Sequence, residues 1–386
     1  MFRPGPEGEG VGGAQDGRRG KMRTISVTKV AVVAAVLALV AAGCTREEER
    51  AEDGDAGQQP AQSLLQVVQD RGTLRCGVNE TVPGFGFLSP DTGEIEGFDI
   101  DFCRAIAAAV LGDAEAIELM PVSAEERFSA LRAGNYDVLV RNTTWTSSRD
   151  GTEGIAFAHV NFYDGQGMFV RADSPYRRVA DMDGTAICVT AGTTTELNLA
   201  DYMAQLGLDY EAVTFEENPQ LQQAFTRGRC DGWTSDKSQL AGLISAWPDE
   251  EGGPESLRLL PDTMSKEPLT PAVLDGDSDW LDAVFWVVNG LILAEELGVT
   301  GGNVDEMAAD PPSALVASLL GVGLEGGAPL DSGLGLSVDF MQGVLRAVGN
   351  YGEIYDRHVG RDGLGLPRGL NALWSDGGLQ YAIPIR

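Results

Sequence analysis

The sequence is poor in positively charged residues, in histidine and in cysteine. It holds 28 lysines and arginines against 58 aspartates and glutamates, which gives a formal net charge of −30. A surface of that sign repels nucleic acids and anionic lipid headgroups, so neither is a plausible binding partner. Histidine occurs twice, at His159 and His358, and cysteine five times. Because the histidines lie far from any cysteine in the sequence and no Cys-x-x-Cys pair occurs, we expect no zinc or other metal site.

No apolar run is long enough to span a membrane, since a spanning helix needs about 20 apolar residues. The run Val30–Ala42 has instead the length of a signal-peptide core, and it follows a cluster of lysines and arginines. It leads into Gly43 and Cys44, and this junction resembles the lipobox of bacterial lipoproteins. That resemblance implies a signal peptide over residues 1–43 and lipid on Cys44. Residues 1–21 have no pattern of a folded segment, so Met22 is an alternative start. A plain secretory signal or a buried apolar helix is the competing interpretation.

Four cysteines follow Cys44, and an even number in an exported chain indicates two disulfides. They are Cys76, Cys103, Cys188 and Cys230. The number of cysteines alone leaves three possible pairings open.

The segment after Cys44 is charged and lacks apolar periodicity. Residues 45–63 read TREEERAEDGDAGQQPAQS, a composition that cannot bury enough apolar surface to fold. We therefore predict residues 44–70 as a disordered tether that precedes the folded body.

The rest of the chain alternates predicted strands with predicted helices. The apolar residues of Phe98–Val110 recur on one helical face, and Ser123 and Glu126 have the spacing of a helix-capping box. Alternation of this kind predicts open, mostly parallel sheets with helices on their faces. The predicted strands are Leu74–Val78, Ile117–Pro121, Tyr136–Val140, Ala186–Val189 and Cys230–Thr234.

A short internal repeat favours two similar lobes. The pattern Ala-Leu-x-x-Gly-x-x-Asp at residues 130–137 returns as Ala-Phe-x-x-Gly-x-x-Asp at residues 224–231. In both places it joins the end of a predicted helix to the start of a predicted strand. The tail from Arg368 onward is rich in leucine, tryptophan and tyrosine, and we expect it to pack back onto the first lobe.

Three polar segments lie near the ends of predicted strands. Arg141–Arg149 offers an arginine fork among hydroxyls and amides, and a guanidinium can bind a carboxylate through two parallel hydrogen bonds. Gly192, Thr193 and Thr194 lie where a helix begins, so their backbone N–H groups can bind an anion. Asp236 lies at the C-terminal edge of the second sheet, where ligands of open α/β sheets bind.

Each segment also has a purely structural interpretation. The arginine segment is compatible with a polar surface loop, Thr193 and Glu196 have helix-capping spacing, and so do Asp236 and Gln239. Taken together, a fixed cation, free amide donors and a fixed anion suit a ligand with a carboxylate and an ammonium on one carbon. A free amino acid is such a ligand.

About residues 72–386 resemble the general L-amino-acid branch of the type II periplasmic binding proteins, solute-binding protein family 3. That resemblance implies an α/β fold of two lobes that close on a ligand, each an open, mostly parallel sheet flanked by helices. Lobe 1 would comprise residues 71–167 and 268–386, and lobe 2 residues 168–267. The motifs that carry the resemblance are CGVN, FDIDFCRAIAAAV, RNTTWTSSRD, YDGQGMFVR, GTTTELNLADY, RCDGWTSD, SKEPLTPAV, EELGVT, GNYGEIYDRHVG and RGLNALWSDGGLQYAIPIR.

The resemblance assigns roles to the polar segments. Arg149 matches the family arginine that holds the α-carboxylate, with Thr144 beside it and Thr194 as an amide donor from the second lobe. Asp236 matches the acid that binds the α-ammonium, and the main chain around Asn142 shares that task. These groups address features that every amino acid carries, so we expect broad specificity.

The resemblance also implies an aromatic contact, and the two lobes suggest a disulfide pairing. Phe85 falls where family members often place an aromatic ring against the ligand side chain. We predict disulfides Cys76–Cys103 and Cys188–Cys230, because each pairing stays inside one lobe and leaves the hinge free to move.

The function that the resemblance implies is capture of free L-amino acids outside the cytoplasm by a lipid-anchored, monomeric protein. It would deliver them to the permease subunits of an ABC importer without a cofactor. Two alternatives are a dehydratase-like enzyme on the same fold and a ligand-sensing module for a membrane receptor. Catalysis would need an acid or base aimed at the reacting carbon, and neither histidine lies in a candidate segment.

Overall fold

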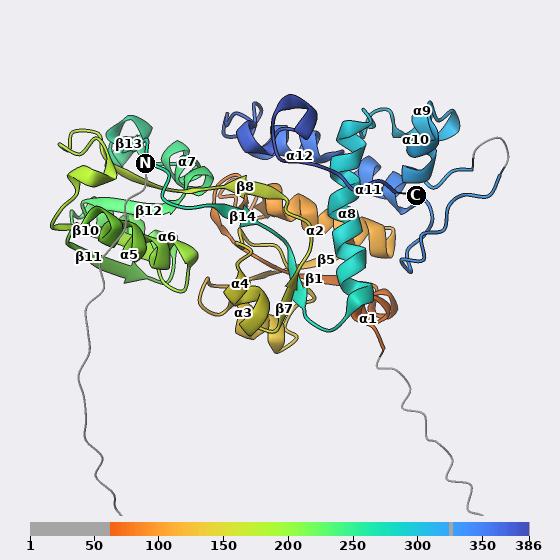
Figure 1. Ribbon diagram of the computed structural model, residues 1–386, viewed down its shortest axis with the longest axis horizontal. Helices are drawn as coiled ribbons and strands as arrows, with labels where there is room; N and C mark the ends of the chain where they lie inside the picture. The colour runs from red at the N-terminus through yellow and green to blue at the C-terminus, as the bar shows by residue number, and fades with distance from the viewer. Residues whose placement is uncertain (1–61, 324–326, 386) are drawn as a thin grey trace, which may run out of the picture. The chain divides into compact units, whose positions relative to one another are not determined.

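The computed structural model describes residues 62–323 and 327–385 (Figure 1). The predicted signal peptide, Cys44 and most of the predicted tether lie outside the described residues. Helix α1 (Leu64–Arg71) is the first element. Ser63 caps it by accepting a hydrogen bond from the Leu65 N–H, and Leu65 and Val68 are buried in the core. The prediction of a tether up to residue 70 is therefore wrong for residues 64–70, whose apolar side chains pack on the folded body.

The first sheet has the strand order β5-β1-β6-β15-β7. Its first three strands are parallel, and β15 runs antiparallel to both of its neighbours. Strands Leu74–Val78 and Ile117–Pro121 have the bounds that the sequence predicts. The strands are β1 (Leu74–Val78), β5 (Ile117–Pro121), β6 (Val138–Leu139), β7 (Ile155–Phe157) and β15 (Ala272–Leu274).

The second sheet repeats this arrangement with the order β11-β10-β12-β9-β13. Strand β10 is parallel to β11 and β12, and β9 is antiparallel to β12 and β13. The predicted fold class of two α/β lobes is therefore confirmed. The strands are β9 (Gln166–Arg171), β10 (Thr185–Thr190), β11 (Tyr210–Phe215), β12 (Gly232–Asp236) and β13 (Leu257–Leu259).

The sequence repeat serves the same purpose in both lobes. Gly134 and Gly228 both have φ of 72°, a left-handed conformation that suits glycine and ends the preceding helix. Three residues later, the carboxylate of Asp137 accepts a hydrogen bond from the Arg75 N–H in β1. The carboxylate of Asp231 likewise accepts one from the Ala186 N–H in β10. Each aspartate thus fixes a returning strand beside the first strand of its sheet.

Two chain segments connect the sheets. Strand β8 (Phe162–Asp164) follows β7, and β14 (Glu267–Leu269) precedes β15. They pair with each other in antiparallel fashion, and Figure 1 shows them between the two sheets. A small third sheet, β2-β3-β4 (Thr81–Val82, Gly86–Leu88 and Ile95–Glu96), precedes α2.

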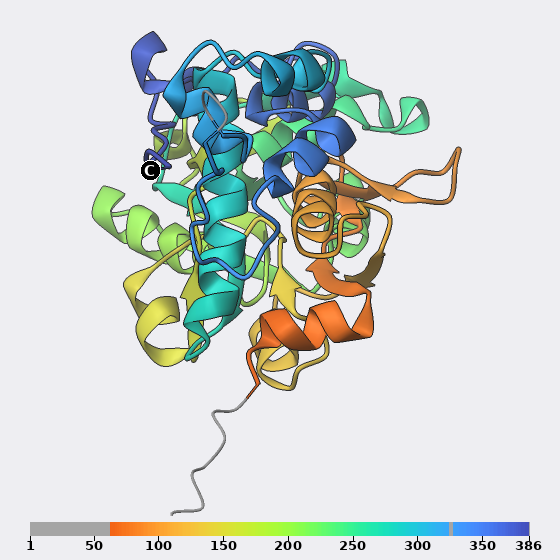
Figure 2. The same ribbon diagram turned by 90° about the vertical axis from the view of Figure 1, so that its right-hand side faces the viewer.

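The helices cover the sheets, and several pack together in the core of lobe 1. Helices α2 (Phe98–Leu111) and α8 (Ser278–Glu296) contact each other there, and each also contacts α11 (Phe340–Val348) and α12 (Tyr351–His358). Figure 2 shows the long helix α8 (teal) with blue C-terminal helices beside it. The remaining α-helices are α3 (Arg127–Arg132), α4 (Ser147–Thr152), α5 (Thr194–Leu206), α6 (Asn218–Thr226), α7 (Lys237–Ser245), α9 (Val304–Ala309) and α10 (Ala314–Leu319). Among the described residues, no helix is long and apolar enough to cross a membrane.

The C-terminal tail packs on lobe 1 as predicted. Leu373 and Ala382 belong to the same buried core as α2 and α8. The Asn289 side chain on α8 donates a hydrogen bond to the Ile383 carbonyl, and the Tyr163 N–H donates one to the Asn371 side chain.

Both predicted disulfides are present. Cys76–Cys103 joins β1 to α2, and Cys188–Cys230 joins β10 to the turn before β12. Each bond therefore connects elements around one sheet.

Candidate functional site

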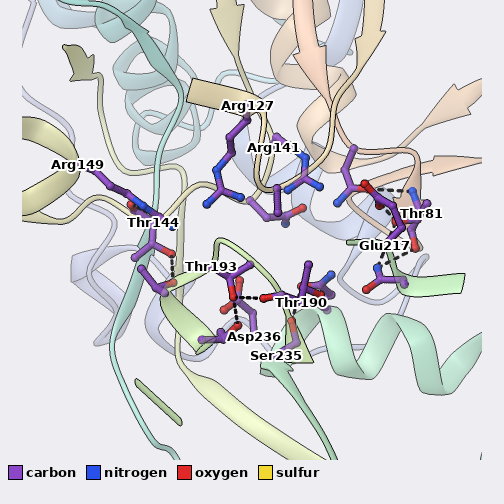
Figure 3. Close-up of a pocket in the computed structure, with 17 residues that line it drawn as sticks. Thr81, Arg127, Arg141, Thr144, Arg149, Thr190, Thr193, Glu217, Ser235 and Asp236 are labelled. Carbon is purple, nitrogen blue, oxygen red and sulfur yellow. Dashed lines mark hydrogen bonds between the residues drawn. The ribbon is translucent and has the colours of Figure 1, made fainter. Parts of the chain in front are cut away.

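A pocket lies where residues of the two sheets face each other (Figure 3). Loops after β1, β5 and β6 and helices α3 and α4 line one side. The ends of β10 and β12 and the starts of α5 and α6 line the other. Among the described residues that line it, Ala124 alone is apolar. The pocket is therefore built to hold a strongly polar ligand.

Six of the seven predicted ligand-binding residues lie at this pocket, although they come from segments far apart in the sequence. They are Asn142, Thr144, Arg149, Thr193, Thr194 and Asp236. The segment from the end of β6 into α4 supplies the first three, the start of α5 supplies the next two, and the end of β12 supplies Asp236.

Phe85 is the predicted residue that the structure does not bring to the pocket. Its side chain is fully buried in the lobe 1 core. The ring packs edge-on against Phe98 at 5.8 Å and Phe162 at 5.1 Å between centroids. The prediction of a ring against the ligand side chain is wrong here, because this aromatic cluster gives Phe85 an apolar environment that the pocket lacks.

Arg149 is a buried cation held in a fixed orientation. Thr146 caps α4 by accepting from the Arg149 N–H, and Arg149 Nη1 donates to the Thr144 carbonyl at 2.9 Å. Its guanidinium also lies over the Phe128 ring. Burial lowers the pKa of Arg149, and the nearby carboxylate of Glu267 opposes that shift. The alternative of an exposed polar loop does not fit, since the side chain is 8% exposed.

Asp236 is a buried carboxylate that does not cap its helix. It ends β12 at the start of α7, yet its side chain makes no capping hydrogen bond, so the structural alternative is wrong. Its Oδ1 atom is buried without a hydrogen-bond partner among the described residues. An uncompensated buried carboxylate is costly and is well suited to receive a cation.

The electrostatic environment of Asp236 supports the same conclusion. Burial raises its pKa well above the usual range, and the neighbouring acids Asp164 and Glu267 raise it further. Arg149 and Arg127 act in the opposite direction. A ligand ammonium beside Asp236 would relieve the repulsion among the three carboxylates.

Thr193 and Thr194 begin α5. The Thr193 hydroxyl accepts from the Glu196 N–H at 3.1 Å, so the predicted capping interaction is present. The Thr194 hydroxyl lies 3.3 Å from that of Thr144 in the other lobe. The two threonines thus meet where the lobes approach each other.

Glu267 connects the hydroxyls of Thr144 and Thr194, and no sequence pattern predicts it as a site residue. Its Oε2 atom accepts from Thr144 Oγ1 at 2.6 Å and from Thr194 Oγ1 at 2.8 Å. Its Oε1 atom accepts from Asn198 Nδ2 at 2.8 Å. Glu267 lies in β14, one of the connecting strands. The motif SKEPLTPAV contains it, but no strand or helix-cap pattern distinguished it from a surface acid.

Two further arginines, Arg127 and Arg141, line the pocket and are buried. Burial lowers the pKa of both guanidinium groups, and repulsion from Arg149 and then Arg141 lowers the pKa of Arg127 further. Asn142 follows with φ of 40°, a left-handed conformation rare outside glycine. Its N–H donates to Asp99, while both polar atoms of its side chain are buried without a partner among the described residues.

The model of one family, the bacterial extracellular solute-binding proteins, family 3, matches residues 74–309. The chain belongs to this family. Family 3 proteins bind solutes, so the chain is a binding protein and not an enzyme.

Relatives within this family cover most of the chain. The general L-amino acid-binding periplasmic protein AapJ of Rhizobium johnstonii is 45% identical over 84% of this chain and 93% of its own length. The glutamate/glutamine/aspartate/asparagine-binding protein BztA of Rhodobacter capsulatus is 43% identical over 84% of this chain and 94% of its own. A periplasmic binding protein of Brucella ovis, solved with glutathione bound, is 42% identical with a TM-score of 0.79. That match covers 84% of this chain and all of the Brucella chain.

Proposed function

We propose that this chain captures free L-amino acids outside the cytoplasm and delivers them to an ABC importer. The observation that carries the proposal is that one pocket holds a buried arginine, Arg149, and a buried carboxylate, Asp236, whose Oδ1 atom has no hydrogen-bond partner among the described residues. A guanidinium suits an α-carboxylate and a carboxylate suits an α-ammonium. These two groups define every amino acid.

The relatives support this ligand class. AapJ is named as a general L-amino-acid-binding protein and BztA as a binder of four amino acids. The Brucella protein holds glutathione, which presents a free α-amino and α-carboxylate group at its γ-glutamyl end.

The individual roles are part of the proposal. Arg149 holds the α-carboxylate together with Thr144 and with the backbone N–H groups of Thr193 and Thr194. Asp236 holds the α-ammonium with the main chain at Asn142. Because all these contacts address shared groups, the protein accepts amino acids of several side-chain classes.

Lobe boundaries and membrane attachment complete the proposal. Helix α1 and residues 71–167 with 268–386 form one lobe and residues 168–267 the other, with β8 and β14 as the hinge. The mature protein is a monomer held at the membrane by lipid on Cys44, and the permease subunits of the importer are its partners.

A thermal-shift screen against the common L-amino acids tests the ligand class, because a compound that binds only the folded state raises the melting temperature. We expect shifts with several amino acids and none with sugars or with simple carboxylic acids that lack the ammonium. A chain that responds to no amino acid would refute the proposal.

A further inference from the structure

The pocket has a second cationic region that the proposed α-group contacts do not use. Arg127 and Arg141 line it and are only 3% and 6% exposed. Figure 3 shows Arg149 beside Thr144 at one end of the pocket, with Arg141 displaced toward the opposite end, where Glu217 lies. An amino acid whose α-groups contact Arg149 and Asp236 would therefore extend its side chain toward Arg141.

Both guanidinium groups retain donors for a ligand. Arg141 uses Nε to donate to the Val122 carbonyl at 2.7 Å, and no hydrogen bond from its terminal nitrogens occurs within the described residues. The Nε of Arg127 is buried without a partner among those residues. Its Nη2 makes only a long contact of 3.4 Å to the Gly192 carbonyl. Donors left unpaired in a buried site are costly.

Among the residues that line this end of the pocket, cations outnumber acids, although the buried Asp99 behind the lining also acts on Arg141. Two buried cations, Arg127 and Arg141, are accompanied by one pocket-lining acid, Glu217, which is only half-buried. The α-groups of an amino acid cancel each other and leave this imbalance unchanged. A side-chain carboxylate would neutralise it, a carboxamide would supply only an acceptor oxygen, and a side-chain ammonium would be repelled.

The far end of the pocket is polar and closed. The Asn218 side chain in lobe 2 donates to Thr81 Oγ1 in lobe 1 at 3.2 Å. Thr81 in turn donates from its N–H to Asn79 at 2.9 Å. These bonds close the pocket with polar groups, which favours short polar side chains over large apolar ones.

We propose that Arg141, together with Arg127, determines specificity by binding the side-chain carboxylate of an acidic amino acid. This inference rests on the proposed function, since it takes Arg149 and Asp236 as the α-group contacts. It sets an order within a broad ligand range: glutamate and aspartate bind most tightly, then glutamine and asparagine, then alanine and leucine, and lysine binds most weakly.

The test is calorimetric titration of the processed full-length protein, freed of bound ligand, with L-glutamate, L-glutamine, L-alanine and L-lysine. Wild type should bind glutamate at least 10-fold more tightly than alanine. Arg141→Met should weaken glutamate roughly 10-fold to 100-fold, the loss expected for a charge-assisted hydrogen bond, and alanine less than threefold. Arg346→Met is the matched control, because Arg346 is exposed on α11 and contacts Asp305 and Gln342 far from the pocket residues; it should change neither affinity.

A second variant gives a change of opposite sign and does not depend on removing a buried arginine. Glu217→Gln should strengthen glutamate several-fold and weaken lysine, because it removes the acid that competes for Arg141. The inference is overturned if glutamate binds no better than alanine, if Arg141→Met weakens both equally, or if Glu217→Gln leaves glutamate unchanged. Wild type that binds none of the four amino acids would instead refute the proposed function itself.

Discussion

Replacing Asp236 with asparagine should weaken ligand binding and stabilise the ligand-free protein at the same time. The substitution keeps the shape of the side chain and removes its charge. Losing one partner of a desolvated charge pair costs roughly 2 to 5 kcal/mol. The affinity for every amino acid should therefore fall about 30-fold to several thousand-fold.

The stability of the ligand-free protein should move the other way. Asp236 has a raised pKa in the folded state. Between its ordinary pKa near 4 and that raised value, the native state binds more protons than the unfolded state, so wild type loses stability as the pH rises through this window. Asparagine removes that loss and should raise the free energy of unfolding at pH 7 by about 1 to 3 kcal/mol.

The assay is denaturant unfolding of ligand-free wild type and Asp236→Asn at pH 7 and pH 4.5, with calorimetric titration of both proteins at pH 7. The stability advantage of the variant should shrink at pH 4.5. At that pH the Asp236 carboxyl of wild type is partly protonated in the unfolded state as well as protonated in the folded state, so folding costs less. Equal affinities, or a variant less stable than wild type at pH 7, would show that Asp236 is a structural residue and not a ligand contact.

Three other changes separate structural roles from binding roles. Phe85→Ala should lower the free energy of unfolding by about 3 to 5 kcal/mol, as measured by denaturant titration, and leave the ranking of amino acids unchanged; an altered ranking would return Phe85 to the pocket. Cys188→Ser with Cys230→Ser opens a loop with a sequence separation of 42 and should cost about 4 kcal/mol in the chain-entropy model; a cost below 1 kcal/mol would contradict that account. Cys44→Ser should release the protein from membranes in a fractionation experiment, and unchanged retention would argue against lipidation.

Much of the fold could be predicted from the sequence because local patterns and global topology agree. The bounds of β1 and β5 follow from short apolar runs between turn residues, and the repeated Gly-x-x-Asp pattern marks equivalent turns at Gly134 and Gly228. Helix α1 was missed because its apolar turn follows a long charged segment, and composition averaged over the whole segment hid Leu65 and Val68.

The candidate site was predictable where it depends on strand ends. Residues at the C-terminal edges of parallel strands converge in this type of fold, which brought Arg149 and Asp236 to one pocket. Glu267 and Arg127 could not be found in this way. Glu267 lies in a connecting strand whose position depends on both lobes, and Arg127 lies on a helix whose buried side is set by tertiary packing. The prediction for Phe85 was wrong for a related reason. Whether an aromatic ring enters a core or a pocket depends on neighbours that are distant in sequence, here Phe98 and Phe162.

The central claim is that the pocket recognises the α-carboxylate and α-ammonium of a free amino acid. The most direct measurement is calorimetric titration of the wild-type protein with L-glutamate, with N-acetyl-L-glutamate and with the α-amide of L-glutamate. Each derivative blocks one α-group and keeps the side chain intact. We predict tight binding of L-glutamate and a loss of roughly 30-fold or more for each derivative. Equal binding of all three compounds would contradict the account.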